Sequence, residues 1–262
     1  MNPILTVLPM CNVASCQCAP NQAFVACEAR NHKDFEHFWS AMPPSAVHSR
    51  SVSAGAGDAG VKEVVVFDFD GTITTDDTFR LFLSYYRGAA NYAVKILSLL
   101  PTFLAYGLRV IDRNVVKAKV INRFFAGEPM PHIEARAESF AKDVIPNLIR
   151  PAAAEALERA KMREKQGLES LYICSASIGP YLRAYFLQHG ITNILATELK
   201  SESGVCSGEI DGYNIWGAGK VRRILAEFAP NDVIIKEAYG DSRGDRELLN
   251  AAKASFYRPF RV

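Results

Sequence analysis

Residues 66–72 read Val-Phe-Asp-Phe-Asp-Gly-Thr, with two aspartates one residue apart at the end of an apolar run. The run begins at Val61 and is rich in β-branched residues, which is typical of a buried strand. Side chains at the carboxyl end of such a strand in an α/β sheet face the crevice where ligands bind. The sequence therefore predicts a strand that delivers Asp68 and Asp70 to a crevice, followed by a turn at Gly71.

Two carboxylates this close repel each other, so they need a cation, a shared proton or exposure to solvent. Asp68 and Asp70 taken alone are equally consistent with a simple acidic turn after a strand. Segments later in the chain favour a functional site.

A second apolar run, over 171–175, ends in the hydroxyl of Ser175, and residues 176–180 then open a helix. A hydroxyl and backbone N–H groups at a strand-to-helix junction suit a phosphoryl oxygen. The simpler interpretation is that Ser175 caps the helix.

Two segments nearer the C-terminus carry charged groups. Lys220 begins an amphipathic helix, and a third apolar run over 233–239 is followed by Asp241 and Asp245. Lys220 could instead be a solvated helix residue, and the two aspartates could cap the next helix. The order of the whole set is more informative than any single member.

The ordered set Asp-x-Asp-Gly-Thr, Ser, Lys and Gly-Asp-Ser-x-x-Asp resembles the four motifs of the haloacid dehalogenase (HAD) superfamily. The resemblance covers the chain from about Val61 to its end. It implies an α/β fold, a Rossmann-like parallel sheet with helices on both faces. It also implies a phosphatase that hydrolyses phosphomonoesters through an aspartyl-phosphate.

The resemblance gives each motif residue a role. Asp68 would attack phosphorus, and Asp70 would protonate the leaving alkoxide and then deprotonate water. Ser175, Ala176 and Lys220 would hold the phosphoryl oxygens. The cofactor would be Mg²⁺, a hard cation that prefers oxygen ligands. Its ligands would be Asp68, the backbone carbonyl of Asp70, Asp241 and Asp245.

About 100 residues separate the first two motifs, far more than a βα loop needs. We expect residues 77–149 to form a helical cap, and residues 61–76 and 150–262 to form the catalytic core. The insert resembles the C1 cap of HAD subfamily IB, in the phosphoserine phosphatase-like branch. Such a cap would exclude water and select the substrate. Helices are predicted from Asp77 or Thr78 to Tyr86, from Ala93 to Arg109, from an Asn114 cap, from Pro131 and from Pro151.

Two further elements are predicted in the C-terminal part of the core. Residues 198–212 alternate in a pattern typical of a small hairpin beside the sheet. Residues 256–260 are expected to pack on the edge of the sheet.

Basic residues dominate the expected cap. Residues 80–123 contain eight basic residues and a single acid, Asp112. Within this span, residues 96–108 carry no charge, but Pro and Gly interrupt them and they are too few for a membrane span. The stretch suits either a segment lying on an anionic bilayer or an ordinary buried cap helix with a solvated basic face. In the first case the lipid would contact Arg113, Lys117 and Lys119.

A basic and apolar cap on this core resembles the phosphatidylglycerophosphatase C type of HAD enzyme, which removes the terminal phosphate from an anionic phospholipid. Phosphoserine phosphatase is the small-molecule alternative. In that family a glutamate holds the substrate amine, and this chain has Asp77 at the corresponding position. The family also commonly has a serine where this chain has Gly71. Histidinol phosphate is a third substrate to consider. We expect a cytoplasmic enzyme, in peripheral contact with the inner face of the membrane if the substrate is a lipid.

Other classes of protein remain alternatives. A phosphotransferase would use the same aspartyl-phosphate but pass it to an alcohol. A non-catalytic lipid-binding module is the alternative outside enzymology, although the full set of charged groups favours an enzyme. No nucleic-acid partner is expected, because aromatic residues do not alternate with the cations and the net charge is only +2.

The first 60 of the 262 residues differ from the rest. They contain four of the six cysteines and three of the five histidines, and they end in a linker-like stretch over 51–60. A metal-binding tail would explain these residues, but we expect a disordered extension without a catalytic role. No basic residue precedes Arg30 and there is no long apolar segment, which argues against a signal peptide. We further expect translation to start near Val61.

Overall fold

The structure is a computed structural model that describes residues 61–261. The expectation of a disordered extension concerns residues 1–60, which lie outside the described residues. Within residues 61–261, every helix falls short of the length and hydrophobicity needed to span a bilayer.

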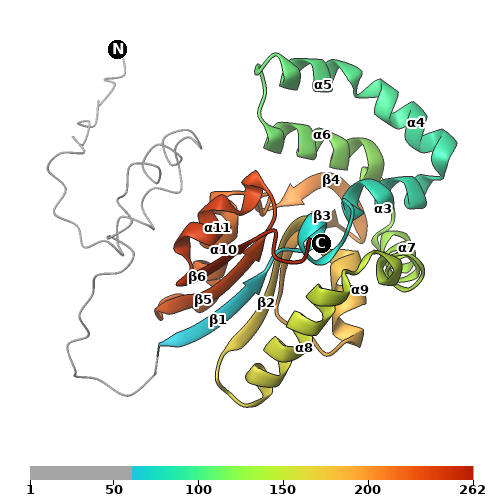
Figure 1. The fold of residues 1–262 in the computed structure, drawn as a ribbon. Coiled ribbons are helices and arrows are strands. Elements are labelled where there is room, and N and C mark those ends of the chain that lie inside the picture. The colour runs from blue at the N-terminus through green and yellow to red at the C-terminus, as the bar shows by residue number, and fades with distance from the viewer. Residues whose placement is uncertain (1–60, 262) are drawn as a thin grey trace, which may run out of the picture. The chain divides into compact units, whose positions relative to one another are not determined.

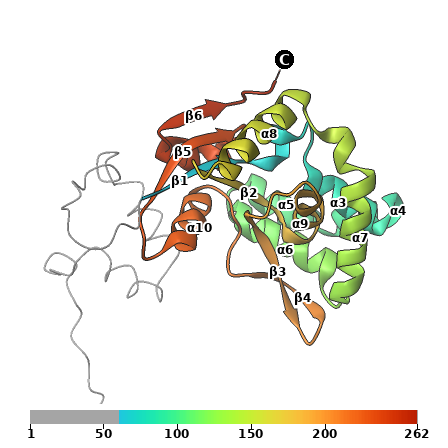
Figure 2. The ribbon, with the colours of Figure 1, turned by 90° about the horizontal axis from the view of Figure 1, so that it is seen from below.

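A six-stranded sheet forms the centre of residues 61–261, in the order β4-β3-β2-β1-β5-β6 (Figures 1 and 2). Neighbouring strands are parallel, except that β3 and β4 form an antiparallel hairpin. The predicted parallel α/β sheet is confirmed. The strands are β1 (Lys62–Phe67), β2 (Ser170–Ile178), β3 (Ile194–Glu202), β4 (Val205–Asp211), β5 (Val233–Gly240) and β6 (Ala254–Tyr257).

β1 occupies the interior of the sheet because its residues are apolar on both faces. Val64, Val65 and Val66 are all completely buried, as expected of a parallel strand covered by helices on both sides. In Figure 1, α8 (Pro151–Lys165) and α9 (Gly179–Gln188) lie on one side of the sheet. The other side carries α10 (Ala218–Phe228) and α11 (Arg246–Ala251).

The register of the sheet brings three strand ends together. Phe67 at the end of β1 pairs with Ile173 on β2 and with Tyr239 on β5. The backbone N–H of Asp68 also donates to the Tyr239 carbonyl at 2.9 Å. The residues that follow these positions therefore lie along one edge of the sheet.

A wide turn, η3 (Phe69–Ile73), carries the chain away from β1. It is closed by a hydrogen bond from the Thr74 N–H to the Phe69 carbonyl, 3.1 Å long. Gly71 has a φ of 74°, which places it in the left-handed region that favours glycine. The predicted turn at Gly71 is confirmed.

The segment between η3 and α8 is helical, as predicted. Its connections to the core run antiparallel, because Thr74 and Ile149 form a β-bridge and the Thr75 N–H donates to the Leu148 carbonyl at 2.8 Å. The segment therefore leaves and rejoins the core at one place. Its elements are α3 (Thr78–Arg87), α4 (Ala89–Ser98), α5 (Leu100–Gly107), α6 (Arg113–Phe125), α7 (Met130–Asp143) and η4 (Ile145–Leu148).

Two helix predictions were wrong in detail. The expected helix from Ala93 to Arg109 is two helices, α4 and α5, which meet at Leu99. Pro101 lies in the first turn of α5, where the missing N–H costs no hydrogen bond, and this explains the break just before it.

The cap residue of α6 is Asp112 rather than Asn114, because the Asp112 carboxylate accepts the Val115 N–H at 2.9 Å. A carboxylate also interacts favourably with the positive end of the helix dipole. Asn114 lies in the first turn and accepts a hydrogen bond from Asn214 at 2.9 Å.

Near the C-terminus, the predicted hairpin is present, but β3 pairs with β2 and so belongs to the main sheet. β6 pairs with β5 at the sheet edge, and the Phe256 ring stacks on Tyr239. The predicted packing of this segment on the edge is confirmed.

Candidate active site

Asp68 lies at the end of β1 with its side chain buried. One carboxylate oxygen accepts a hydrogen bond from Lys220 at 2.5 Å, and the other accepts from the Thr72 hydroxyl at 2.8 Å. Two donors on two different oxygens fix the direction of the carboxylate. Exposure to solvent, one way in which the two carboxylates could avoid repulsion, is therefore excluded for Asp68.

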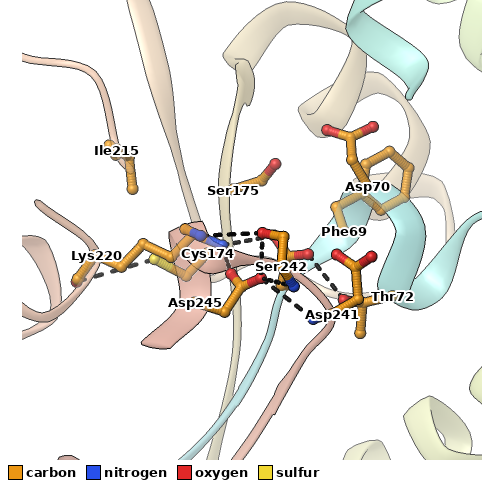
Figure 3. Close-up of polar contacts among 12 residues, drawn as sticks. Phe69, Asp70, Thr72, Cys174, Ser175, Ile215, Lys220, Asp241, Ser242 and Asp245 are labelled. Carbon is orange, nitrogen blue, oxygen red and sulfur yellow. Dashed lines mark hydrogen bonds and ion pairs between the residues drawn. The ribbon is translucent and has the colours of Figure 1, made fainter. Parts of the chain in front are cut away.

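Lys220 comes from the first turn of α10 and is only 2% exposed. Its ammonium group donates to Asp68 and also to Asp245 at 2.6 Å. Figure 3 shows the contact between Lys220 and Asp245. Burial alone would lower the pKa of Lys220, but the two carboxylates raise it above its ordinary value. Lys220 is thus a buried charge shared by two acids, and the solvated interpretation is wrong.

Asp241 and Asp245 follow β5 and are held by their own loop. The second oxygen of Asp245 accepts hydrogen bonds from the Ser242 N–H at 3.0 Å, the Ser242 hydroxyl at 2.8 Å and the Asp241 N–H at 3.2 Å. The Asp241 carboxylate pairs with the Arg261 guanidinium. The loop therefore presents both acids towards Asp68.

The acids of this cluster differ in how readily they ionise. Burial raises the pKa of Asp68 to about 7, and the Asp245 charge adds to this effect while Lys220 opposes it. Burial alone would also raise the pKa of Asp245, but the charge and hydrogen bond of Lys220, with the Ser242 donors, hold it below its ordinary value. The pKa of Asp241 is raised, first by burial and then by Asp245.

The three carboxylates could hold a metal ion. Asp68, Asp241 and Asp245 each offer an oxygen, and these oxygens lie within 4.8 Å of one another. Three carboxylates against Lys220 and Arg261 leave an excess of negative charge in a buried place, which a divalent cation would offset. The donor set is all oxygen and suits Mg²⁺.

The Asp70 carboxylate is directed elsewhere. In Figure 3 it lies apart from Lys220 and Asp245. One oxygen accepts the Thr78 N–H at 2.7 Å, and the other accepts the Ser177 hydroxyl. Burial, and next the charge of Asp77, raises the pKa of Asp70 despite these donors. A carboxyl group that keeps its proton more readily than usual suits a proton donor.

Ser175 is buried near the end of β2, where the sheet register slips between Ser175 and Ile178. Its hydroxyl accepts the Ser177 N–H at 3.0 Å. It does not cap α9, which starts only at Gly179. Ala176 follows in the same strand and is partly exposed.

Asp77 caps α3, because its carboxylate accepts the Arg80 N–H at 2.9 Å. On α6, Lys117 lies over the Phe79 ring, with its nitrogen 3.0 Å from the ring centroid. Burial lowers the pKa of Lys117 to about 7, while the charges of Asp70 and Asp77 act in the opposite direction. A cation of the helical segment therefore lies close to the acids of the core.

Four contacts in this region were not predicted from the sequence. Thr72 holds Asp68, Thr78 and Ser177 hold Asp70, and Ser242 holds Asp245. Thr72 and Ser242 lie inside the motifs and could have been suspected. The contact of Ser177 with Asp70 spans more than 100 residues and has no local signal in the sequence.

Comparison with known proteins bears on this site. The family model of the haloacid dehalogenase-like hydrolases matches residues 65–250. The chain belongs to this family. The CicA protein of Caulobacter vibrioides is 34% identical over 206 residues, which cover 76% of this chain and 86% of CicA. The prediction of an HAD-type enzyme is confirmed, and the non-catalytic alternative loses its support.

Solved structures share the fold at low sequence identity. A protein of unknown function from Bordetella pertussis aligns with a TM-score of 0.63 and 19% identity, over 75% of this chain and 89% of the other. A probable phosphoserine phosphatase from Vibrio cholerae aligns with a TM-score of 0.56 and 14% identity, over 75% and 55% of the two chains. These solved structures share the predicted HAD-type fold, and the predicted helical insert follows the first motif. The family match makes the chain an HAD-type hydrolase.

Proposed function

We propose that this HAD-type enzyme hydrolyses phosphomonoesters with Mg²⁺ through an aspartyl-phosphate on Asp68. The observation that carries the proposal is the buried Lys220 ammonium, which joins Asp68 to Asp245 beside Asp241. A lysine and three acids buried together are costly for stability unless the site has a use for their charge.

The residues divide the reaction between them. Asp68, oriented by Thr72 and Lys220, attacks phosphorus and displaces the alkoxide, which takes the proton of Asp70. Asp70, now a carboxylate, removes a proton from a water molecule. That water attacks phosphorus, the bond between phosphorus and the Asp68 oxygen breaks, and inorganic phosphate leaves, so that Asp68 is a carboxylate again and Asp70 is protonated again.

Mg²⁺ would be held by Asp68, Asp241 and Asp245 and by the backbone carbonyl of Asp70. When bound, it would neutralise charge on the phosphoryl oxygens. Ser175, Lys220 and the backbone at Ala176 would hold the same oxygens from the protein side.

Residues 77–149 act in this proposal as the cap over a core formed by residues 61–76 and 150–262. Lys117 then faces the leaving group of the substrate. A cation there suits a leaving group that is itself anionic, and disfavours histidinol phosphate, whose leaving group carries an amine. Asp77 would be the amine ligand for phosphoserine, but its carboxylate already caps α3.

An anionic phospholipid such as phosphatidylglycerophosphate is therefore the substrate class we favour, ahead of phosphoserine. The solved phosphoserine phosphatases share only the fold and do not decide between them. A lipid substrate would place a cytoplasmic enzyme at the inner face of the membrane.

Phosphate release with and without Mg²⁺ tests the proposal. The substrates are phosphatidylglycerophosphate in mixed micelles, phosphoserine, histidinol phosphate and an aryl phosphate. Asp68→Asn should lower kcat by roughly 10³-fold or more on every substrate, as the loss of a covalent nucleophile does. Asp76→Asn, which changes an exposed acid outside the cluster, is the matched control.

Full activity of Asp68→Asn would refute the aspartyl-phosphate. A preference for phosphoserine would overturn the assignment of a lipid substrate but leave the aspartyl-phosphate mechanism in place. Transfer of phosphate to an added alcohol in place of release would make the enzyme a phosphotransferase.

A further inference from the structure

The helices α4 and α5 form an arm along the outer side of α6, away from the sheet (Figure 1). Neither helix contains a buried residue. Six aliphatic side chains of the arm and of the turn that follows α5 are 52–76% exposed, and we call them the arm patch. The arm patch consists of Val94, Leu97, Leu100, Leu104, Leu108 and Val110.

The arm patch is not needed to attach the arm to the protein. The opposite side of the arm already packs inwards through Leu99, which is 7% exposed, and through Tyr92, whose ring lies 6.0 Å from that of Phe124. Phe103 also packs against the core cluster. A helix that is apolar on its outer side as well normally has a partner there.

The charged residues around the arm patch indicate which kind of partner would bind it. Residues 78–111 contain no acid. Arg109 is exposed and lies between Leu108 and Val110 in the sequence. Lys95 of α4 and Arg123 of α6 join the arm to α6 instead: Lys95 donates to the Arg123 carbonyl and Arg123 donates to Ser98, both at 2.7 Å. Asp112, the first acid that follows, caps α6.

We propose that the arm patch docks on an anionic lipid bilayer. Aliphatic side chains would enter the boundary between head groups and acyl chains, and Arg109 at the edge of the arm patch would contact lipid phosphates. A symmetric contact with a second copy would bring like charges together, because a two-fold axis places the same patch on both partners. The helices are too short to cross the membrane, so the contact is peripheral.

The apolar part of this surface includes the stretch over 96–108 expected from the sequence, but the cations beside it differ from those expected. Lys117 packs on Phe79 near the acidic site, and Arg113 lies 5.5 Å from the Trp216 ring, so neither belongs to the arm patch. The inference concerns α4 and α5 and stands whether the substrate is a lipid or a small molecule.

Flotation of the full chain with vesicles tests the inference. Wild-type protein should float with vesicles of 70% phosphatidylcholine and 30% phosphatidylglycerol, and much less with phosphatidylcholine alone. The triple variant Leu97→Ser, Leu104→Ser, Leu108→Ser should bind the anionic vesicles at least tenfold more weakly. Its activity on a soluble aryl phosphate should stay unchanged.

Two controls make the result specific. Leu168→Ser with Leu187→Ser changes exposed leucines outside the arm and should bind as the wild type does. Asp68→Asn should lose activity but float with the anionic vesicles as the wild type does. Flotation therefore tests the docking independently of the proposed chemistry.

Equal flotation of the triple variant and the wild type would overturn the inference. So would a wild type that ignores both vesicles and forms a dimer that the triple variant dissociates, because the arm patch would then bind a second copy.

Discussion

Gly71 turns the backbone of η3 directly against the Asp241 carboxylate. A Cβ atom added there would lie 2.6 Å from an oxygen of Asp241, at a φ of +74°. Phosphoserine phosphatases commonly have a serine at this position, but in this chain a side chain there would have to displace the Asp241 carboxylate. Glycine thus serves both the turn and the position of the Asp241 carboxylate, the proposed metal ligand.

We predict that Gly71→Ala weakens Mg²⁺ binding, because Asp241 must move away from the new methyl group. The half-saturating Mg²⁺ concentration should rise several-fold, and unfolding should cost about 1 kcal/mol less for the positive φ. Gly88→Ala is the matched control, since Gly88 has a φ of +75° with no atom within 4 Å. Equal Mg²⁺ titrations of the two variants would contradict the steric argument.

We predict that Lys117 makes kcat/KM depend on pH. Its pKa is lowered from 10.5 to about 7, so it is charged at pH 6 and neutral at pH 8. If the charged form binds the leaving group, kcat/KM should fall as pH rises through 7, by about tenfold between pH 6 and pH 8.

Lys117→Arg is the appropriate reference, because arginine stays charged throughout this range. The ratio of wild-type to variant kcat/KM, measured on one substrate, cancels the ionisation of the substrate and of the acids. A ratio that does not change with pH would remove Lys117 from the substrate site.

Two neighbouring residues at the start of α6 have different roles. Asp112 caps the helix, whereas Asn114 accepts a hydrogen bond from Asn214 in a distant part of the sequence. Asp112→Ala should lower the free energy of unfolding by about 1 kcal/mol, because it leaves a first-turn N–H of α6 without its acceptor. Asn114→Ala should leave the helix start intact and remove only the hydrogen bond to Asn214. Urea unfolding of both variants measures the difference, and a larger loss for Asn114→Ala would return the cap to that residue.

The elements that the sequence predicts best are those with local signals. β1 is a run of β-branched residues stopped by a turn, and α3 has Asp77 as a cap. The start of α6 was misplaced by two residues, because aspartate and asparagine are equally good caps. The break between α4 and α5 was missed, although Pro101 was visible, because proline is tolerated in a first turn.

The candidate site was predictable from the order of distant motifs rather than from local signals. Asp68, Ser175, Lys220 and Asp241 are far apart in sequence, and the order of motifs assigned them to one site before any register was known. Their burial was not predictable, since Lys220 reads as an ordinary surface lysine. The donors Thr78 and Ser177 depend on how the insert meets β2, which local patterns do not encode.

Metal binding should be visible in the stability of the whole chain. A ligand at about 100 times its Kd adds about 2.7 kcal/mol to the folded state. For a chain of this size that corresponds to a Tm higher by about 5–10 °C. Mg²⁺ should produce this shift in the wild type and in Asp211→Asn, an exposed acid outside the cluster. Asp241→Asn should lose it, and a full shift in that variant would take Asp241 off the ligand set.

The bridge between Thr74 and Ile149 means that the helical segment is inserted into the core through two adjacent strands of chain. An insertion of this kind can be exchanged without changing how far apart its attachment points are. The helical segment can therefore be treated as an exchangeable part, and the sheet with its surrounding helices as the part that receives it. If the helical segment is the cap we propose, grafting residues 76–148 onto another core of the same fold, joined at this bridge, should transfer the choice of substrate while the acids and Lys220 stay in place.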